Sequence, residues 1–182
     1  MHAVRRELED LFLELRQEFL YNSTIPKHTS EHIIKEPDVN SSDLHILIAE
    51  DEPSHALVIR RCLEREYPAA CIEVVSSIHG YRDSIATATP TIALVDLNLS
   101  DGSAMELFAD SAAPFTFPIV IMSSYASKQV AINAVKAGAM ELVIKSPELF
   151  FSMPQLVEKT IHAWKLRLEE NQAPQTPADP HS

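Results

Sequence analysis

The fold of this chain is decided by the stretch Ala93-Leu94-Val95-Asp96-Leu97-Asn98-Leu99-Ser100-Asp101-Gly102. It begins as a short apolar strand that carries one carboxylate, Asp96, to its end, and an Asp-Gly turn signal follows at once. About 45 residues earlier, a second apolar strand, Ile46-Leu47-Ile48-Ala49, leads into Glu50-Asp51-Glu52. If the two strands are neighbours in a parallel sheet, their acidic side chains meet at one edge. The stretch therefore predicts an acidic site on an α/β sheet.

Apolar segments alternate with helical patterns from residue 44 onward. We predict strands at 44–49, 71–75, 91–95, 118–122 and 141–144, and helices at 53–66, 78–88, 103–110, 127–137 and 152–170. The last helix has an apolar stripe of Val157, Ile161, Trp164 and Leu168. Five strand–helix pairs predict a domain over 44–170 with a parallel sheet of order 2-1-3-4-5 and helices on both faces, as in flavodoxin-like folds.

The N-terminal segment 1–21 has an amphipathic pattern. Apolar residues recur at helical spacing, namely Val4, Leu8, Leu11 and Leu15, and charged residues occupy the outward positions. We predict a helix over 3–21. Two alternatives stay open for it: packing against its own domain, or pairing with a partner or a second copy, which would give a homodimer.

The segments that flank the domain contain few apolar residues. Residues 22–43 are rich in Ser, Thr and Asn and are interrupted by prolines, which predicts a linker. Within it, His28-Thr29-Ser30-Glu31-His32 matches the H-x-x-E-H pattern of one family of zinc proteases. That chemistry needs a supported helix and a third ligand, so we interpret the segment as solvated linker. Residues 171–182 are polar and proline-rich, and we expect a disordered tail.

Composition excludes several classes of function. The net charge is −11, from 26 acidic and 15 basic residues, and a surface of this sign repels nucleic acid. No apolar run approaches the length of a membrane span, and the charged N-terminus has no signal-peptide core, so we expect a cytoplasmic protein with no membrane partner. Cys62 and Cys71 fall in a helix and at a strand start, which predicts buried free thiols.

The candidate site contains five chemically useful side chains at the strand ends. Glu50, Asp51 and Asp96 would repel one another unless a cation lies between them, and hard oxygen ligands favour Mg2+. Ser123 ends the fourth strand and Lys145 follows the fifth, so a hydroxyl and an ammonium reach the same edge. Together these groups could support formation of an aspartyl phosphate on Asp96.

Over residues 44–170 the chain resembles the receiver domain of bacterial two-component response regulators. Five motifs match in order: Ile-Leu-Ile-Ala-Glu50-Asp51-Glu52, Leu-Val-Asp96-Leu-Asn98-Leu, Ile-Val-Ile-Met-Ser123-Ser124-Tyr125, Ala137-Gly138-Ala139 and Ile144-Lys145. The resemblance implies that Asp96 accepts a phosphoryl group from the phosphohistidine of a sensor kinase or a histidine phosphotransfer protein. It also implies Mg2+ bound directly by Asp51, Asp96 and the backbone carbonyl of Asn98, and through water by Glu50.

The same resemblance implies how the signal would be read. Ser123 and Lys145 would bind the phosphoryl oxygens and carry the switch, whereas Asn98 and Tyr125 would tune dephosphorylation by controlling the access of water. The sequence departs from the family pattern in three places, the mildest being Glu50-Asp51 in place of the usual Asp-Asp pair. Lys145-Ser146-Pro147 replaces the usual Lys-Pro, which shifts any cis bond by one residue, and Leu142 stands at the aromatic switch position.

Phosphorylation of a receiver would act by changing protein contacts. We expect the segments 127–137, 141–144 and 152–170 to repack and the surface around Lys128 and Lys136 to change partners. Because a dozen polar residues follow the last helix, we expect the output to be either contact with a downstream protein, with the N-terminal helix as one route, or onward phosphotransfer. We expect no enzyme activity beyond self-phosphorylation and self-dephosphorylation. The alternatives are a non-phosphorylated interaction module and a haloacid-dehalogenase-like phosphatase. The latter requires an acid two positions after its nucleophile, where this chain has Asn98.

Overall fold

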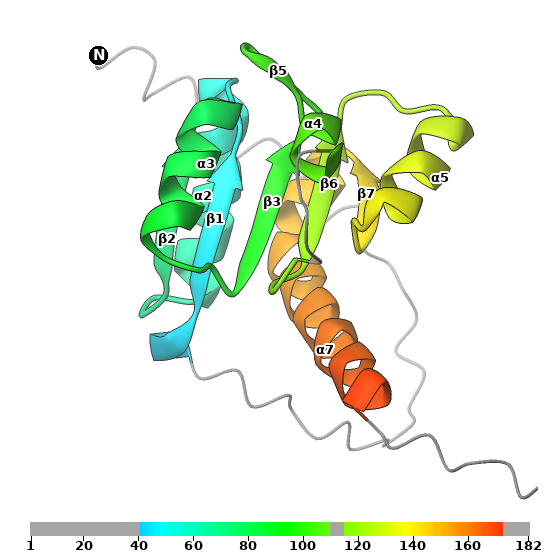
Figure 1. Ribbon diagram of the computed structural model, residues 1–182. Coiled ribbons are helices and arrows are strands. Elements are labelled where there is room, and N and C mark those ends of the chain that lie inside the picture. Colours follow the sequence, from blue (N-terminus) through cyan, green and yellow to red (C-terminus); the bar gives the residue numbers. More distant parts are fainter. Residues whose placement is uncertain (1–40, 110–114, 173–182) are drawn as a thin grey trace, which may run out of the picture.

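A computed structural model of the chain describes residues 41–109 and 115–172. Five parallel strands form its main sheet in the order β2-β1-β3-β6-β7 (Figure 1). They are β1 (His45–Ala49), β2 (Cys71–Val75), β3 (Ile92–Asp96), β6 (Ile119–Ser123) and β7 (Glu141–Ile144). This confirms the predicted order 2-1-3-4-5. The helix predicted over 3–21, the His28–His32 motif and the linker up to residue 40 lie outside the described residues.

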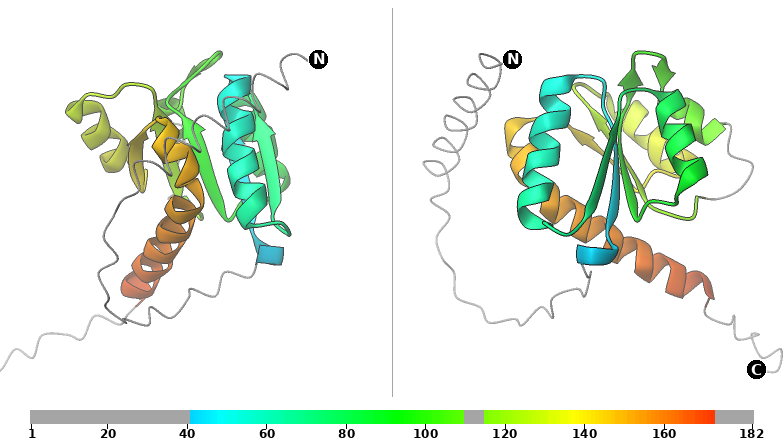
Figure 2. Two further views of the ribbon diagram at one scale, coloured as in Figure 1. Left: turned by 180° about the vertical axis from the view of Figure 1, so that it is seen from behind. Right: turned by 90° about the vertical axis from the view of Figure 1, so that its left-hand side faces the viewer.

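Helices cover both faces of the sheet, as the right-hand view of Figure 2 shows. One layer contains α2 (Pro53–Glu66), α6 (Pro147–Phe151) and α7 (Met153–Gln172). The other contains α3 (Ile78–Thr87), α4 (Met105–Ala109) and α5 (Lys128–Ala137). A short 3-10 helix, η1 (Ser41–Asp43), precedes β1, and a small hairpin of β4 (Asn98–Leu99) and β5 (Gly102–Ser103) follows β3.

The strands are apolar along their length because both of their faces are buried. In β1, Ile46 and Ile48 pack into the core under α2 and α7, and Leu47 and Ala49 pack into the core on the opposite face. All four side chains are fully buried. Burial of a large aliphatic side chain contributes about 1.5–3 kcal/mol. This double core fixes the positions of the strand ends, where the candidate site lies.

Polar residues before the helices determine where they begin. The Glu52 side chain accepts a hydrogen bond from the Ser54 backbone N–H, and Pro53 occupies the first turn of α2. Ser77 and Ser127 cap α3 and α5 in the same way. Glu52 therefore acts as a helix cap, which explains why the third acid of the Glu-Asp-Glu run stands apart from the other two.

Two predicted elements differ from the structure. The predicted helix 152–170 is preceded by a separate helix, α6, because Ser146 caps it and Pro147 suits its first turn. The predicted helix 103–110 begins at Met105 because residues 102–103 form β5. Helix α7 extends to Gln172, so the first two residues of the predicted tail 171–182 are helical, and the remainder lies outside the described residues.

Two predictions about burial were wrong. Cys71 is exposed, because it begins the edge strand β2, whereas Cys62 is buried as expected. Leu168 is 40% exposed, although Val157 and Ile161 of the same stripe are buried. Figure 1 shows the reason, since α7 continues past the ends of the strands.

Two further features of the described residues are the isomers of their peptide bonds and the length and polarity of their helices. None of their peptide bonds is cis, so the Ser146–Pro147 bond is trans. In addition, the helices within these residues are too short or too polar to cross a membrane.

Candidate functional site

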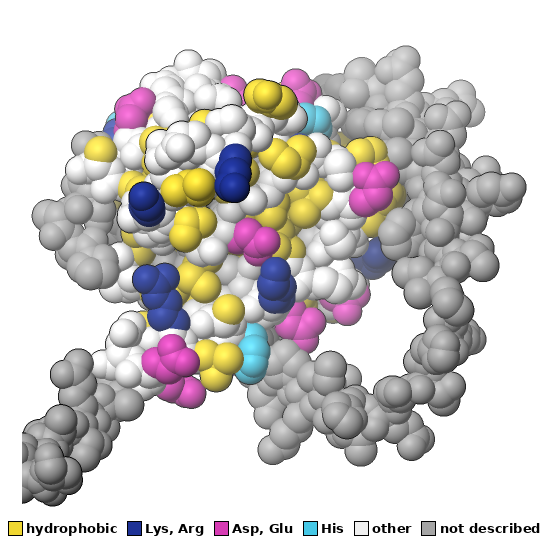
Figure 3. Space-filling model, turned by 90° about the vertical axis from the view of Figure 1, so that its right-hand side faces the viewer, with side chains coloured by type: hydrophobic (Ala, Val, Ile, Leu, Met, Phe, Trp, Pro, Cys, Tyr) yellow, Lys and Arg dark blue, Asp and Glu magenta, His cyan; other side chains and the backbone are white. Residues whose placement is uncertain are grey.

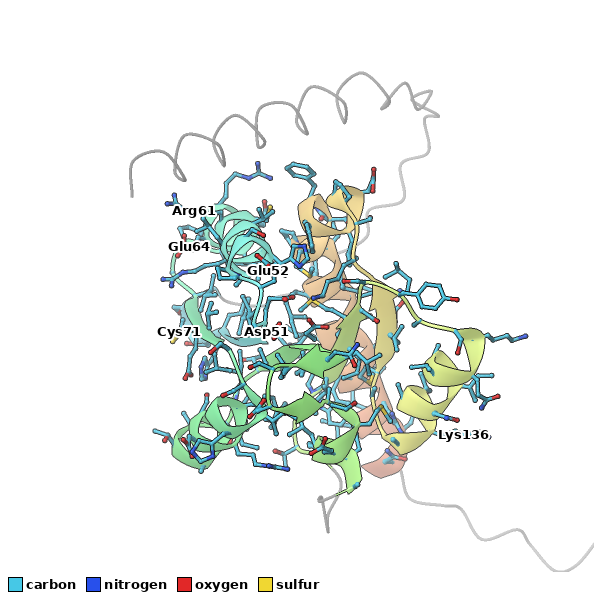
Figure 4. All side chains as sticks on the ribbon, turned by 90° about the horizontal axis from the view of Figure 1, so that it is seen from above. Asp51, Glu52, Arg61, Glu64, Cys71 and Lys136 are labelled. Atoms are coloured by element: carbon cyan, nitrogen blue, oxygen red, sulfur yellow. The ribbon has the colours of Figure 1, made fainter. Side chains whose placement is uncertain are left out.

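Three acidic residues meet at the carboxyl ends of β1 and β3. Glu50 and Asp51 follow β1, and Asp96 is the last residue of β3; one carboxylate oxygen from each lies within 4.8 Å of the others. Glu50 is 2% exposed and Asp96 is 7% exposed. In Figure 4, which views the molecule from above, Asp51 lies over the middle of the sheet. The structure therefore brings together the three acids that the sequence singles out.

Lys145 supplies the positive charge at this cluster. Its Nζ lies 2.6 Å from Asp96 Oδ2 and 2.6 Å from Glu50 Oε2, and its side chain is only 4% exposed. The backbone N–H of Lys145 donates to the Ser123 carbonyl at 2.8 Å, which continues the pairing of β6 and β7 by one residue. This bond fixes the position of the Lys145 backbone. From there the side chain extends across β6, and its ammonium reaches the acids.

The charge state of Glu50 reflects two opposing influences. Burial raises the pKa of the Glu50 carboxyl, whereas the hydrogen bond and positive charge of Lys145 lower it; Asp96 raises it further, and the net direction is upward. The other carboxylate oxygen, Oε1, accepts the Glu52 backbone N–H at 3.3 Å. An additional cation at this point would favour the ionised form of Glu50.

His55 is a member of this region that sequence reasoning missed. Its Nδ1 lies 3.7 Å from Glu50 Oε1, and its ring packs against Phe150 with centroids 5.3 Å apart. The available signal was its position in the first turn of a helix that starts directly after the acidic run. A first-turn side chain lies close to the strand end that precedes it, so His55 borders Glu50.

Ser123 lies at the same edge, but its hydroxyl is engaged in a local turn. Ser123 is 1% exposed; its Oγ donates to the Tyr125 carbonyl at 2.7 Å and accepts the Tyr125 backbone N–H at 3.3 Å. The Tyr125 side chain is 83% exposed. The hydroxyl must therefore leave the Tyr125 carbonyl before it can donate to a group bound at Asp96.

The hairpin after Asp96 adds a backbone contact to the cluster. The Asn98 backbone N–H donates to Asp96 Oδ1 at 3.3 Å, and the Asn98 side chain is exposed. Leu142 lies on β7 opposite Ile121 and is half-buried in the core beside α5. The backbone of Asn98 thus borders the acids, whereas Leu142 contributes packing.

Asp101, in the turn of this hairpin, is a second residue whose role the sequence did not reveal. Its carboxylate accepts the backbone N–H groups of Ile78 at 2.8 Å and His79 at 3.0 Å, and these bonds lower the pKa of Asp101. The next residue, Gly102, has a φ of +151°, and a Cβ atom there would lie 2.7 Å from Glu106 Oε1. The Asp-Gly pair therefore shapes the loop and ties it to α3.

The donor set fits a hard divalent cation. Three carboxylates converge, two of them buried, and a single lysine ammonium offsets only part of their charge. Mg2+ typically binds one or two carboxylates and keeps several waters, which suits a cluster where Asp51 is half-buried. The acidic cluster is therefore chemically suited to a metal ion at the strand ends.

Comparison with known proteins identifies the family. The model of the response regulator receiver domain matches residues 46–159. The methanogenesis regulatory protein FilR1 of Methanothrix harundinacea is 27% identical over 124 residues, which are 66% of this chain and 28% of that protein. The response regulator protein PilR of Pseudomonas aeruginosa is 31% identical over 137 residues, which are 73% of this chain and 28% of that protein. The acid tolerance regulatory protein ActR of Rhizobium meliloti is 24% identical over 123 residues, and the match covers 62% of it.

Solved structures support the fold. A CheY-like receiver domain from Methanospirillum hungatei matches with a TM-score of 0.54 and 24% identity, over 71% of this chain and 98% of that one. A signal receiver domain from Colwellia psychrerythraea matches with a TM-score of 0.55 and 22% identity, over 64% of this chain and 99% of that one. The chain spans less than two thirds of the three curated relatives named above. Because the family model covers more than half of its residues, the chain belongs to the response regulator receiver domain family.

Proposed function

We propose that this chain is a phosphoacceptor in a two-component phosphorelay and that Asp96 is the phosphorylated residue. A carboxylate oxygen of Asp96 would attack the phosphorus of a phosphohistidine on a sensor kinase or a histidine phosphotransfer protein. The new bond joins that oxygen to phosphorus, and the phosphorus–nitrogen bond breaks, which returns the electron pair to the imidazole. The convergence of Glu50, Asp51 and Asp96 with the buried Lys145 ammonium supports this proposal most strongly.

Asp51, Asp96 and the Asn98 backbone carbonyl are the proposed direct ligands of Mg2+, and Glu50 would bind it through water. A bound Mg2+ neutralises charge that develops on the phosphoryl oxygens. The chain's own groups do the remaining work: Asp96 supplies the nucleophile, and Lys145, already 2.6 Å from Asp96 Oδ2, is placed to bind a phosphoryl oxygen. These proposed roles include the buried charged side chains Glu50, Asp96 and Lys145 of the described residues.

The proposed switch begins at Ser123. A phosphoryl group on Asp96 would draw the Ser123 hydroxyl away from the Tyr125 carbonyl, which it now contacts at 2.7 Å. The loop containing Tyr125 leads directly into α5, so its movement would reach the surface that carries Lys128 and Lys136. A downstream protein that binds one state better than the other then shifts the equilibrium. Asn98 and Tyr125 are the proposed regulators of water access to the phosphorylated Asp96. Because Leu142 occupies the aromatic switch position, the proposed switch does not use an aromatic side chain there.

Incubation of the full chain with acetyl phosphate and Mg2+, followed by intact mass measurement, tests the proposal. The native chain should gain one phosphoryl group, and chelation of Mg2+ should prevent the gain. Asp96→Asn should gain none, whereas the control Asp83→Asn, on the exposed surface of α3, should behave as the native chain. An unmodified native chain would contradict the proposal, and continuous release of phosphate from an ester would favour a phosphatase instead.

A further inference from the structure

Six large hydrophobic side chains of the described residues are exposed. Apart from Tyr125, they lie on α5, β7 and α7: Ile132, Val135, Ile144, Leu166 and Leu168, each between 37% and 52% exposed. We call this surface the α5–β7–α7 face. Figure 3 shows this side of the molecule, where hydrophobic side chains are interspersed among Lys, Arg, Asp and Glu. Ile132 and Val135 lie about one turn apart on the same side of α5, and neighbouring exposed apolar side chains are typical of an interaction site.

The arrangement of α7 extends this apolar surface toward one end of the molecule. The helix has 20 residues, about 30 Å in length, whereas the strands have only four or five residues. Its last turns therefore pass the sheet. Leu166 and Leu168 are exposed there on opposite sides of the helix. Leu166 is on the same side as Lys159, which contacts Glu141, and the neighbouring Arg167 contacts Met140. Figures 1 and 2 show that η1, where the described residues begin, lies at the same end. The chain thus enters the domain at the end toward which the exposed part of α7 extends.

Residues 3–21, which precede the described part of the chain, have the sequence pattern that this face requires. Their apolar stripe of Val4, Leu8, Leu11 and Leu15 would match exposed aliphatic side chains on α5 and α7. An isolated helix of this length is marginal in water and gains most of its stability from packing of its apolar side. A helix with this apolar pattern is therefore expected to pack on a partner surface.

Charge and tether length favour this segment over other occupants. Residues 1–21 contain five acidic and three basic residues, whereas α5 carries Lys128 and Lys136 and no acid. Residues 22–40 could span up to roughly 60 Å when extended, which exceeds the length of α7. A tethered segment also acts at an effective concentration in the millimolar range, which an untethered copy rarely reaches.

We propose that residues 3–21 dock as an amphipathic helix on the α5–β7–α7 face of their own chain. The docked segment covers Ile132, Val135 and the exposed end of α7, and its acidic residues lie beside Lys128 and Lys136. The proposal does not depend on phosphorylation of Asp96, so either can fail without the other.

Hydrogen exchange on the full chain tests the docking with a matched pair of variants. Leu11→Asp places a charge in the apolar stripe, and Gln17→Asp places one on the opposite side of an ideal helix. Leu11→Asp should increase exchange in peptides spanning 128–137 and 161–172, by about tenfold in rate where the docked segment had protected them. Gln17→Asp should leave exchange there as in the native chain, and peptides from α2 should not change in either variant.

A reciprocal variant and the oligomeric state complete the test. Val135→Asp changes a side chain that is 52% exposed, so the core stays intact, and it should increase exchange in peptides spanning 3–21. Light scattering should give a monomer, with protection independent of protein concentration. Equal exchange in Leu11→Asp and Gln17→Asp would overturn the proposal. A dimer whose protection rises with concentration would also overturn it, because the occupant would then be a second copy.

Discussion

The ammonium of Lys145 lies 2.6 Å from the carboxylate of Asp96, although the two residues are 49 positions apart in the chain. The contact crosses β6, which separates β3 from β7 in the sheet. Lys145 reaches Glu50 at the same distance, so one buried cation offsets two of the three clustered acids. Any metal ion that binds here must share these acids with the lysine.

Removal of the Lys145 charge should therefore strengthen metal binding. In Lys145→Gln, Mg2+ no longer competes with an ammonium for Glu50 and Asp96, and we expect the Kd to fall about tenfold, the equivalent of roughly 1.4 kcal/mol. Titration calorimetry measures this directly. Lys159→Gln, which removes an exposed lysine paired with Glu141 at 3.3 Å, is the control and should leave the Kd unchanged. Weaker binding by Lys145→Gln would place the metal ion elsewhere.

Glu50 should make stability depend on pH in buffer that contains a chelator. Because burial raises its folded-state pKa above the ordinary 4.5, the folded state binds the Glu50 proton more tightly than the unfolded state. The contribution of Glu50 to stability therefore falls as pH rises through this range. Compared with the native chain, Glu50→Gln should have a similar Tm at low pH and a higher Tm at neutral pH. If the Tm of the native chain rose relative to that of Glu50→Gln as the pH increased, the positive charge of Lys145 would affect the pKa of Glu50 more strongly than burial does.

Asp101 should show the opposite pH dependence. Its backbone hydrogen bonds from Ile78 and His79 lower its pKa below 3.8, so its contribution is present at neutral pH and is lost as pH falls through the folded-state pKa. We expect Asp101→Ala to lower the Tm at pH 7 because two N–H groups at the start of α3 lose their acceptor. The deficit should shrink in acid. Asp83→Ala, farther along α3, serves as the control, and an equal deficit in both variants would contradict the capping role.

Removal of the Ser123 hydroxyl should prevent the switch without preventing phosphorylation of Asp96. In Ser123→Ala, the Asp96 carboxylate is intact, so the chain should still accept a phosphoryl group. The variant lacks the hydroxyl that would move from the Tyr125 carbonyl to the phosphoryl group. Binding of beryllofluoride with Mg2+ should therefore no longer change hydrogen exchange in residues 128–137. Ser124→Ala, whose residue is exposed, should respond like the native chain. A full response in Ser123→Ala would assign the switch to another group.

The sheet could be predicted because its strands carry a strong signal. Residues 46–49 and 93–95 are uninterrupted apolar runs, which is typical of strands buried on both faces. Their acidic ends meet because parallel strands place their carboxyl ends at one edge. The same rule predicted that Lys145 lies at this edge. It could not predict that Lys145 contacts both Glu50 and Asp96, because packing determines the reach and direction of a long side chain.

The features that were missed depend on short-range geometry. The β4–β5 hairpin has two residues in each strand, too few for a periodic pattern, and α6 has only five residues. The Ser146-Pro147 pair was a helix-start signal that could have revealed α6. The exposure of Cys71 and Leu168 depends on where the sheet ends, and no local pattern records the edge of a sheet.

Chemical identification of the phosphorylated residue shows directly whether Asp96 is the phosphoacceptor. Borohydride reduces an acyl phosphate on aspartate to homoserine, which peptide mass spectrometry locates. After treatment with acetyl phosphate and Mg2+, the peptide containing Asp96 should carry homoserine at that position, and the peptide containing Asp51 should be unchanged. Homoserine at position 51, or at any position other than 96, would show that Asp96 is not the phosphoacceptor.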